Sequence, residues 1–313
     1  MPRYSIGVDM GGTNLRAAAV AEDGTMLGKA AGSTPLQAGP DAAVADMVRL
    51  IQGVQERLGK DGPGKSDLAG VGIGVPGFIR MDTGVIAGWA QQPAFAGYPI
   101  RDQIEQRLGA KVILENDANS AALGEKWIGA GTDVNDLVLL TLGTGIGGGI
   151  ISGGRILHGA QGMAAELGHM TVSPNGYPCG CGNRGCLEKH ASATAIAAMG
   201  RLMNLGASLT AEDVYNLAVA GNERALAVFR SMGESLGIAI ASLVNIFNFP
   251  LYLLSGGPIP AWQFFAPSML AEVERRSFTY RSAPTRIEPA KLGNEAGLYG
   301  AAYLPFQDEG RSA

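Results

Sequence analysis

The sequence contains little cysteine and no stretch rich in lysine and arginine. Its three cysteines, Cys179, Cys181 and Cys186, all lie within residues 179–188, which read CGCGNRGCLE. Three cysteines cannot all pair with one another, and we therefore expect no disulfide framework. The formal net charge is −4, and because no basic run offsets it, we expect no nucleic-acid-binding surface.

Signals for export or membrane insertion are also weak. The first residues, MPRYSIGVDMGG, lack a basic stretch followed by a long apolar run and a small-residue cleavage site, so we expect a cytoplasmic protein without a signal peptide. Residues 238–254 are apolar enough to raise the question of a membrane span. Asn245, Asn248 and Pro250 interrupt this stretch, which favours a buried helix that runs into a buried strand.

Glycine is present in excess, at 47 of 313 residues. It follows no collagen-like period, so we expect tight turns and places where the backbone approaches a ligand. The chain of 313 residues is also longer than a single hydrophobic core usually supports, which predicts two domains. Apolar strand-like runs alternate with helical patterns, and each half opens with a strand, near residues 4–8 and 137–142. We therefore predict a mixed α/β fold of two similar lobes with no low-complexity linker.

Two glycine-rich turns have the features of phosphate-binding loops. Residues 9–14 (DMGGTN) and 143–149 (GTGIGGG) each follow a predicted strand, and glycine there lets backbone N–H groups approach an anion. Neither is a Walker loop, because no Gly-Lys-Ser/Thr follows. Neither is a Rossmann fingerprint, because a strand rather than a helix follows each turn.

A single turn of this kind is equally typical of a β-hairpin. The two turns together with residues 255–258 (SGGP) favour a nucleotide, with one loop from each lobe gripping its polyphosphate across a cleft. The residues that we expect to contact the nucleotide are Asp9, Gly11, Gly12, Thr13, Asn14, Gly143, Thr144, Gly145, Gly256 and Gly257.

The strand predicted at residues 111–114 ends in Glu115-Asn116-Asp117. Ligand sites of open α/β sheets lie at the carboxyl ends of strands. In phosphoryl transfer to a hydroxyl, a carboxylate accepts the hydroxyl proton, and Asp117 is placed for this role, with Asn116 beside it to fix the acceptor. The alternative is that Asp117 and Asn119 cap the following helix. Asn119 or Ser120 can provide that cap instead, which would leave Asp117 for chemistry.

The cysteine spacing, Cys179-x-Cys181-x4-Cys186, places three thiolates on a tight glycine-rich loop, and His169 precedes them by ten residues. Three sulfurs and one imidazole form a closed tetrahedral zinc set. The alternative is three buried free thiols. Four protein ligands leave no open coordination position, so we expect a structural zinc rather than a catalytic one.

Two carboxylates flank this loop, Glu166 before His169 and Glu188 after the last cysteine. A metal that orders the loop would fix both carboxylates, which suit the hydroxyls of a sugar. The remaining histidines, His158 and His190, have no such neighbours in the sequence, and we expect them at loop or surface positions.

Together these motifs resemble those of the ROK family of sugar kinases, within the actin/hexokinase-like superfamily, and most of all the bacterial glucokinases of that family. The resemblance extends from Val8 to about Tyr303. The stretches that support it are DMGGTN (9–14), GVGIGVPG (70–77), ENDANSAALGE (115–125), LGTGIGGGI (142–150), GAQGMAAELGH (159–169), CGCGNRGCLE (179–188), LSGGP (254–258) and LGNEAGLYGAA (292–302).

The resemblance implies two ribonuclease-H-like lobes around a nucleotide and sugar cleft. A small lobe would comprise residues 1–117 and 296–313, because the C-terminal helix returns to it, and a large lobe with the zinc loop would comprise residues 118–295. It also implies ATP as phosphoryl donor, Mg²⁺ near Asp9, Asp117 as general base, and a homodimer or a dimer of dimers. No membrane or nucleic-acid partner is implied.

The sugar hydroxyls would be held, by the same resemblance, by Gly77, Asn116, Asp117, Glu166, His169 and Glu188. His169 would contact the sugar through one ring nitrogen and zinc through the other, and metal ligation would fix its tautomer. One departure from the family pattern concerns an Asn-x-Pro-Gly-Trp-like stretch, which here reads Gln91-Gln92-Pro93-Ala94-Phe95. Gln91 would replace an asparagine that holds the sugar, which affects the identity of the sugar more than the reaction.

The expected activity is ATP-dependent phosphorylation of a hexose, with glucose converted to glucose 6-phosphate. Other acceptors in the family remain open: N-acetylmannosamine, N-acetylglucosamine, mannose, fructose and allose, as does inorganic polyphosphate as donor. The family also contains sugar-sensing repressors with an N-terminal helix–turn–helix. Because the first phosphate loop begins at Asp9, we do not expect that class, and a non-catalytic sugar-binding protein is the weaker alternative.

Overall fold

The computed structural model describes residues 3–12, 14–33, 36–59, 62–89 and 92–309. The chain divides into two compact units. Unit 1 comprises Met1–Asn135, Gly149–Ala164 and Asn294–Ala313, whereas unit 2 comprises Asp136–Gly148 and Ala165–Gly293.

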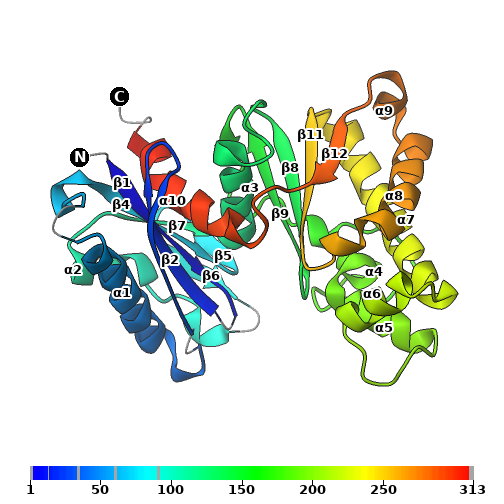
Figure 1. Ribbon diagram of the computed structural model, residues 1–313, viewed down its shortest axis with the longest axis horizontal. Helices are drawn as coiled ribbons and strands as arrows, with labels where there is room; N and C mark the ends of the chain where they lie inside the picture. Colours follow the sequence, from blue (N-terminus) through cyan, green and yellow to red (C-terminus); the bar gives the residue numbers. More distant parts are fainter. Residues whose placement is uncertain (1–2, 13, 34–35, 60–61, 90–91, 310–313) are drawn as a thin grey trace. The chain divides into compact units, whose positions relative to one another are not determined.

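A five-stranded sheet forms the centre of unit 1, in the order β3-β2-β1-β4-β7 (Figure 1). Strands β1, β2 and β3 form an antiparallel meander, and β4 and β7 continue the sheet parallel to β1. The strands are β1 (Tyr4–Met10), β2 (Asn14–Ala21), β3 (Met26–Ser33), β4 (Leu68–Val75) and β7 (Val112–Asn116). A separate hairpin consists of β5 (Phe78–Arg80) and β6 (Val85–Gly88).

The second sheet repeats this arrangement in the order β10-β9-β8-β11-β12. Strand β11 pairs in parallel with both β8 and β12, and β10 is antiparallel to β9. The strands are β8 (Leu137–Leu142), β9 (Ile146–Ser152), β10 (Arg155–Ile156), β11 (Leu251–Gly256) and β12 (Arg286–Pro289). Both sheets thus have the third, second, first, fourth and fifth of their strands side by side, which confirms the predicted α/β class of two ribonuclease-H-like lobes.

Helices cover both faces of the first sheet (Figure 1). Alternate residues of β1, including Tyr4, Ile6 and Val8, pack with helices α1 (Pro40–Arg57) and α2 (Ile100–Leu108) in one core. On the opposite face, Ala18 and Val20 of β2 pack with helix α10 (Ala296–Glu309). In α1 the apolar residues at helical spacing, namely Val44, Met47, Val48 and Ile51, are all buried.

Helix α10 packs against β1, β4 and helix α3 (Asp117–Ile128). This packing places α3 in unit 1, so the compact units differ from the predicted boundary after Asp117. Glycine makes the contact possible. A Cβ on Gly72 of β4 would lie 1.8 Å from the Ala301 carbonyl oxygen, and one on Gly300 would lie 1.6 Å from the Ser120 carbonyl oxygen.

Unit 2 contains the long helix α7 (Glu223–Phe247), which packs against α8 (Trp262–Arg276). By length and composition α7 could span a membrane, but 67% of its most apolar window is buried inside the protein. Strand β11 follows it, so the predicted buried helix and strand at residues 238–254 are confirmed. The remaining helices are α4 (Glu188–Ala191), α5 (Ala193–Leu202), α6 (Ala211–Val219) and α9 (Phe278–Ser282).

Thr210 and Asp213 form a capping box at the start of α6. Hydrogen bonds from Thr210 lower the pKa of Asp213.

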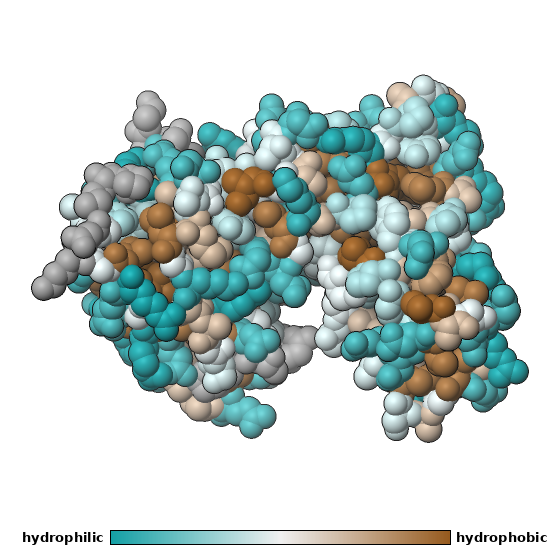
Figure 2. Space-filling model, in the orientation of Figure 1, coloured by the Kyte–Doolittle hydropathy of each residue, from teal (hydrophilic) through white to brown (hydrophobic). Residues whose placement is uncertain are grey.

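On the surface, brown apolar residues lie among teal hydrophilic ones (Figure 2). Phe278 and Ile246 are the most exposed large apolar residues described, at 74% and 68%.

We expect Gly300→Ala to destabilise the protein, because its Cβ would overlap the Ser120 carbonyl oxygen in α3. The free energy of unfolding should fall by about 3 kcal/mol or more, at the upper end for overpacked sites. Chemical denaturation measures the change. Gly53→Ala is the matched control: it lies inside α1 with nothing within 4 Å of its Cβ position, so this change should stabilise by about 0.5–1 kcal/mol. Equal stability of the two variants would contradict the close-contact account.

Candidate active site

The junction between β7 and α3 places the predicted base. Helix α3 begins at Asp117, and Asn116 is its N-cap in extended conformation. Asn116 Oδ1 accepts hydrogen bonds from the backbone N–H groups of Ala118 at 2.9 Å and Asn119 at 3.1 Å. The expectation that Asn119 or Ser120 caps the helix is therefore wrong. An N-cap must precede the first helical residue, and both of these already lie in the first turn.

Asp117 occupies the first helical position, where the helix dipole favours a negative charge. Its Oδ1 accepts a hydrogen bond from the Ala118 N–H at 2.9 Å. The side-chain amide of Asn116 donates to the carbonyl oxygen of Gly77 at 3.4 Å. Gly77 has φ 95°, and a Cβ there would lie 2.5 Å from the Gly88 carbonyl oxygen. The structure thus brings together the three site residues predicted in unit 1 outside the glycine turn, namely Gly77, Asn116 and Asp117.

Glu115 and His158 form a pair that sequence reasoning missed. His158 Nε2 lies 2.6 Å from Glu115 Oε2, and the Glu115 side chain is only 2% exposed. His158 does lie in a loop, as predicted, but its ring has a buried partner. The two residues are 43 positions apart, so no local pattern indicates that they meet.

The first glycine turn connects β1 and β2 as a hairpin. The Gly11 N–H donates to the Asn14 carbonyl oxygen at 2.8 Å, and Gly12 has no atom within 4 Å of its Cβ position. The hairpin alternative and the phosphate-loop prediction are therefore compatible, because the turn leaves Gly12 open. Thr13, which was predicted to contact the nucleotide, lies outside the described residues.

Asp9, at the start of this turn, forms an ion pair with Arg16. Arg16 Nη1 also lies 3.6 Å from Glu295 Oε1, and Lys29 Nζ lies 2.7 Å from the same oxygen. Asp9 thus belongs to a mixed cluster of two acids and two bases, in which Arg16 balances its charge.

The second glycine turn connects β8 and β9 and is held to helix α5. The Ala193 N–H donates to the Gly143 carbonyl oxygen at 2.8 Å, and Thr194 Oγ1 donates to the Thr144 carbonyl oxygen at 2.8 Å. At Gly145 the side-chain position is occupied: a Cβ would lie 2.4 Å from Glu188 Oε2. Glycine at this position leaves room for the Glu188 carboxylate.

The two glycines of the stretch 255–258 differ in the space around their Cβ positions. Gly256 has φ 107°, and a Cβ there would lie 2.1 Å from the Leu142 carbonyl oxygen. Strand packing therefore requires this glycine. Gly257 has no atom within 4 Å of its Cβ position and leaves its backbone open to a ligand.

Three of the predicted sugar ligands lie in unit 2. Glu188 Oε2 accepts a hydrogen bond from the Ile146 N–H at 3.2 Å, which fixes this carboxylate beside the second glycine turn. His169 Nε2 lies 3.9 Å from Glu166 Oε2. Burial raises the pKa of Glu166, the neighbouring His169 lowers it, and Glu188 raises it. Ala165, which precedes Glu166, has φ 68°. Non-glycine residues in this left-handed conformation are uncommon and cluster at functional sites.

The predicted metal ligands come together in unit 2. His169 Nδ1 lies 3.7 Å from Cys179 Sγ, and Cys181 Sγ lies 3.7 Å from Cys186 Sγ. All four ligand atoms lie within 4.8 Å of one another. Zinc–sulfur bonds of about 2.3 Å in a tetrahedron separate the sulfurs by roughly 3.8 Å, so the donor set fits zinc.

The thiols of this cluster differ in their affinity for protons. Burial, hydrogen bonds that the Cys186 thiol donates to the neighbouring cysteines, and the negative charge of those cysteines raise the pKa of Cys186 to about 12. A hydrogen bond from the Asn183 backbone lowers the pKa of Cys181. Because metals bind thiolates, a bound cation must displace these protons.

His190 lies in helix α4 with its ring half-buried against Tyr177, at a centroid distance of 5.5 Å. Its predicted loop or surface position is therefore wrong. Among the described residues, its buried Nε2 has no hydrogen-bond partner, and burial lowers its pKa. A Cβ on Gly176 would lie 2.8 Å from His190 Nε2, so the ring lies against the segment that precedes the cysteines.

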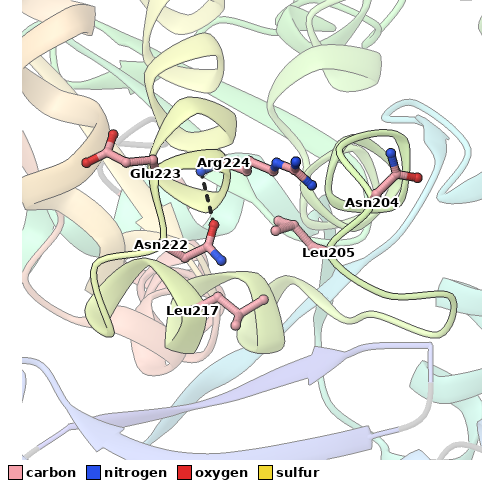
Figure 3. A pocket seen from close by; sticks show the side chains of 6 residues that line it. All are labelled: Asn204, Leu205, Leu217, Asn222, Glu223 and Arg224. Carbon is pink, nitrogen blue, oxygen red and sulfur yellow. Dashed lines mark hydrogen bonds between the residues drawn. The ribbon is translucent and has the colours of Figure 1, made fainter.

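A separate hollow of about 360 Å³ lies at the start of α7 (Figure 3). There the Asn222 side chain caps the helix and accepts a hydrogen bond from the Arg224 N–H at 3.0 Å. None of the predicted site residues lines this hollow. Its lining consists of Asn204, Leu205, Leu217, Asn222, Glu223 and Arg224.

Comparisons with known proteins identify the family of the chain. A model of the ROK family matches residues 5–308. A glucokinase from Halalkalibacterium halodurans is 38% identical to the chain, over 98% of this chain and 96% of the relative. Among solved structures, a ROK hexokinase from Thermus thermophilus is similar with a TM-score of 0.83 and 32% identity, covering 97% of this chain and 99% of that one.

A ROK family glucokinase from Streptomyces griseus, solved in complex with glucose and AMPPNP, is similar with a TM-score of 0.79 and 32% identity, covering 97% of this chain and 99% of that one. The match to the family model and the identity to its members extend over nearly the whole chain. The chain therefore belongs to the ROK family.

Proposed function

We propose that this chain is an ATP-dependent sugar kinase that converts glucose to glucose 6-phosphate. The observation that carries the proposal is the position of Asp117, a carboxylate at the N-terminus of α3, beside Asn116 and Gly77. The likeness over nearly its whole length to a glucokinase, and to a glucokinase structure with glucose and AMPPNP, supports the same assignment.

Asp117 would act as general base. As the sugar hydroxyl oxygen attacks the γ-phosphorus of ATP, its proton passes to the Asp117 carboxylate. The new oxygen–phosphorus bond forms as the bond to the bridging oxygen breaks, and ADP leaves. Asp117 lies in the first turn of α3, where the helix dipole favours a negative charge.

The sugar hydroxyls would be held by the residues that already have fixed orientations. Asn116 is fixed by its cap bonds, and Glu188 by the Ile146 N–H. Glu166 and His169 face each other at 3.9 Å and would complete the set. Gln91, the predicted replacement for a family asparagine, lies outside the described residues. The ADP-release assay described below tests which sugar is preferred.

The nucleotide would be bound by the glycine turns, in which Gly12 and Gly257 leave open backbone. Asn14, Gly143 and Thr144 lie in the same turns. Gly145 and Gly256 would contribute through their backbone amides, since neighbouring atoms occupy the space at their Cβ positions. Mg²⁺ would neutralise phosphate charge near Asp9, where it would compete with Arg16 for the carboxylate.

The cysteine cluster would hold a structural zinc. His169 would ligate it through Nδ1, which faces Cys179, and this leaves Nε2 directed toward Glu166 and the sugar. The cluster would thereby order the loop between Glu166 and Glu188.

We further propose a cytoplasmic homo-oligomer, a dimer or a tetramer, that acts in glycolysis and has no nucleic-acid or membrane partner.

We expect Asp117→Asn to lower kcat by about 10²-fold or more, the usual contribution of a general base, because asparagine cannot accept the proton. A coupled ADP-release assay with Mg-ATP measures this across glucose, mannose, fructose, allose and the N-acetyl hexosamines. Asp102→Asn on the surface of α2 is the matched control and should retain full activity.

The outcomes of this assay separate the alternatives. Turnover with a sugar other than glucose would keep the mechanism and change the substrate. Turnover only with polyphosphate would change the donor. No turnover with any of these, from folded protein, would reject the kinase proposal.

We expect about one zinc per chain in the purified protein, measured by elemental mass spectrometry. Cys186→Ser should lose this metal and lower the thermal midpoint by several degrees, because the loop loses its cross-link. Zinc retention should also fall as pH is lowered, because protons compete for the three thiolates. His190→Gln, four residues along and outside the ligand set, should keep the metal. Equal zinc in both variants would contradict the assigned ligands.

A further inference from the structure

Glu115 connects three parts of unit 1 through one buried carboxylate. Its Oε1 accepts hydrogen bonds from the Asn116 N–H at 2.9 Å and from Asn119 Nδ2 at 3.0 Å. Its Oε2 lies 2.6 Å from His158 Nε2. A carboxylate that is 2% exposed is costly unless its oxygens are hydrogen-bonded, so each of these partners matters to its orientation.

The contacts of Glu115 surround the proposed base. Asp117 lies between Glu115 and Asn119 along the chain, and Asn119 is 3% exposed. Among the described residues, Asn119 Oδ1 has no hydrogen-bond partner. The bond from its Nδ2 to Glu115 is therefore the one that orients this side chain in the first turn of α3. The orientation of Glu115 thus affects the turn that carries Asp117.

His158 brings a distant segment to this junction. It follows β10, and its carbonyl oxygen accepts a hydrogen bond from the Ala164 N–H at 3.1 Å. Two residues after Ala164 the chain reaches Glu166, the first of the proposed sugar ligands in unit 2. His158 therefore anchors the start of this connecting segment to the strand end that carries Asp117.

From these contacts we propose that His158 is a positioning residue for the base: through Glu115 it holds the first turn of α3, and so the Asp117 carboxylate, in the orientation that catalysis requires. The inference rests on the proposed kinase function. A reacting group displaced by about 1 Å can lose roughly 10²-fold in rate, so loss of this contact should lower turnover rather than nucleotide binding.

A hollow of about 440 Å³ beside β7 exposes one side of His158. Its side chain is 24% exposed, so it can be replaced without filling a closed core. Lys111 lines the same hollow and pairs with Asp308 at 2.5 Å, away from Glu115. Lys111→Ala is therefore a matched control that removes an ion pair from the same hollow.

His158→Leu tests the inference by removing the hydrogen-bonding nitrogen while it keeps bulk at the site. We expect kcat to fall about 10–100-fold, with the KM for Mg-ATP within about twofold of wild type. His158→Gln restores a side-chain N–H within reach of Glu115 and should recover kcat to within about threefold. Lys111→Ala should leave kcat unchanged.

Amide hydrogen exchange gives a readout that does not depend on turnover. Exchange at residues 116–120 should be faster in His158→Leu than in wild type and close to wild type in His158→Gln. Glu115→Gln weakens the same bonds and should lower kcat in the same direction. This variant also carries the test if His158→Leu does not fold.

The outcomes distinguish this inference from the proposed function. If wild type turns over and His158→Leu matches it, or if His158→Gln is as impaired as His158→Leu, the positioning role is wrong and the kinase assignment stands. A second outcome is that wild type phosphorylates no sugar while amide exchange at residues 116–120 is still faster in His158→Leu than in His158→Gln. In that case the anchoring contact stands and the kinase assignment is wrong. Unchanged exchange in His158→Leu rejects the contact itself.

Discussion

Direct backbone contact through glycine is the constraint on which unit 1 depends. Helix α10 comes from the far end of the sequence and covers a face of the first sheet. It can do so because Gly7, Gly72 and Gly300 have no side chain at the contact, where a Cβ would lie within 2.3 Å of a carbonyl oxygen. Helix α3 packs against α10 in turn, so the helix that begins with Asp117 is held by the same contact. Part of the glycine excess thus serves packing.

Carboxylates with fixed partners organise both parts of the site. In unit 1, Glu115 accepts hydrogen bonds from the β7–α3 junction and faces His158. In unit 2, Glu188 accepts the Ile146 N–H and occupies the space left by Gly145. Each carboxylate links a strand end to a segment far away in sequence, so the polar groups that would contact a sugar are oriented before it binds. His169 has a similar double role, with one nitrogen toward Cys179 and the other toward Glu166.

Features that depend on short-range patterns could be predicted from the sequence. The strands alternate with helices at recognisable periods, the apolar face of α1 follows helical spacing, and Thr210 with Asp213 forms a capping box over three residues. The cluster of His169 with three cysteines could be predicted because three of its four residues share one loop. The helix cap at Asn116 could not, because Asn116, Asn119 and Ser120 are all acceptable caps and only the first helical residue decides among them.

The sequence by itself determined the fold class, through residue types at short and regular separations, and the family, through the resemblance of its motifs. It also indicated that His169 and the three cysteines form a cluster. The tertiary structure alone decided that His158 meets Glu115 across 43 residues, that His190 is half-buried, and that the neighbouring strand requires a glycine at Gly256. The physical reason is that such contacts arise when whole elements pack. Their partners come from segments whose separation along the chain has no period, and only the packed backbone brings them within hydrogen-bonding distance.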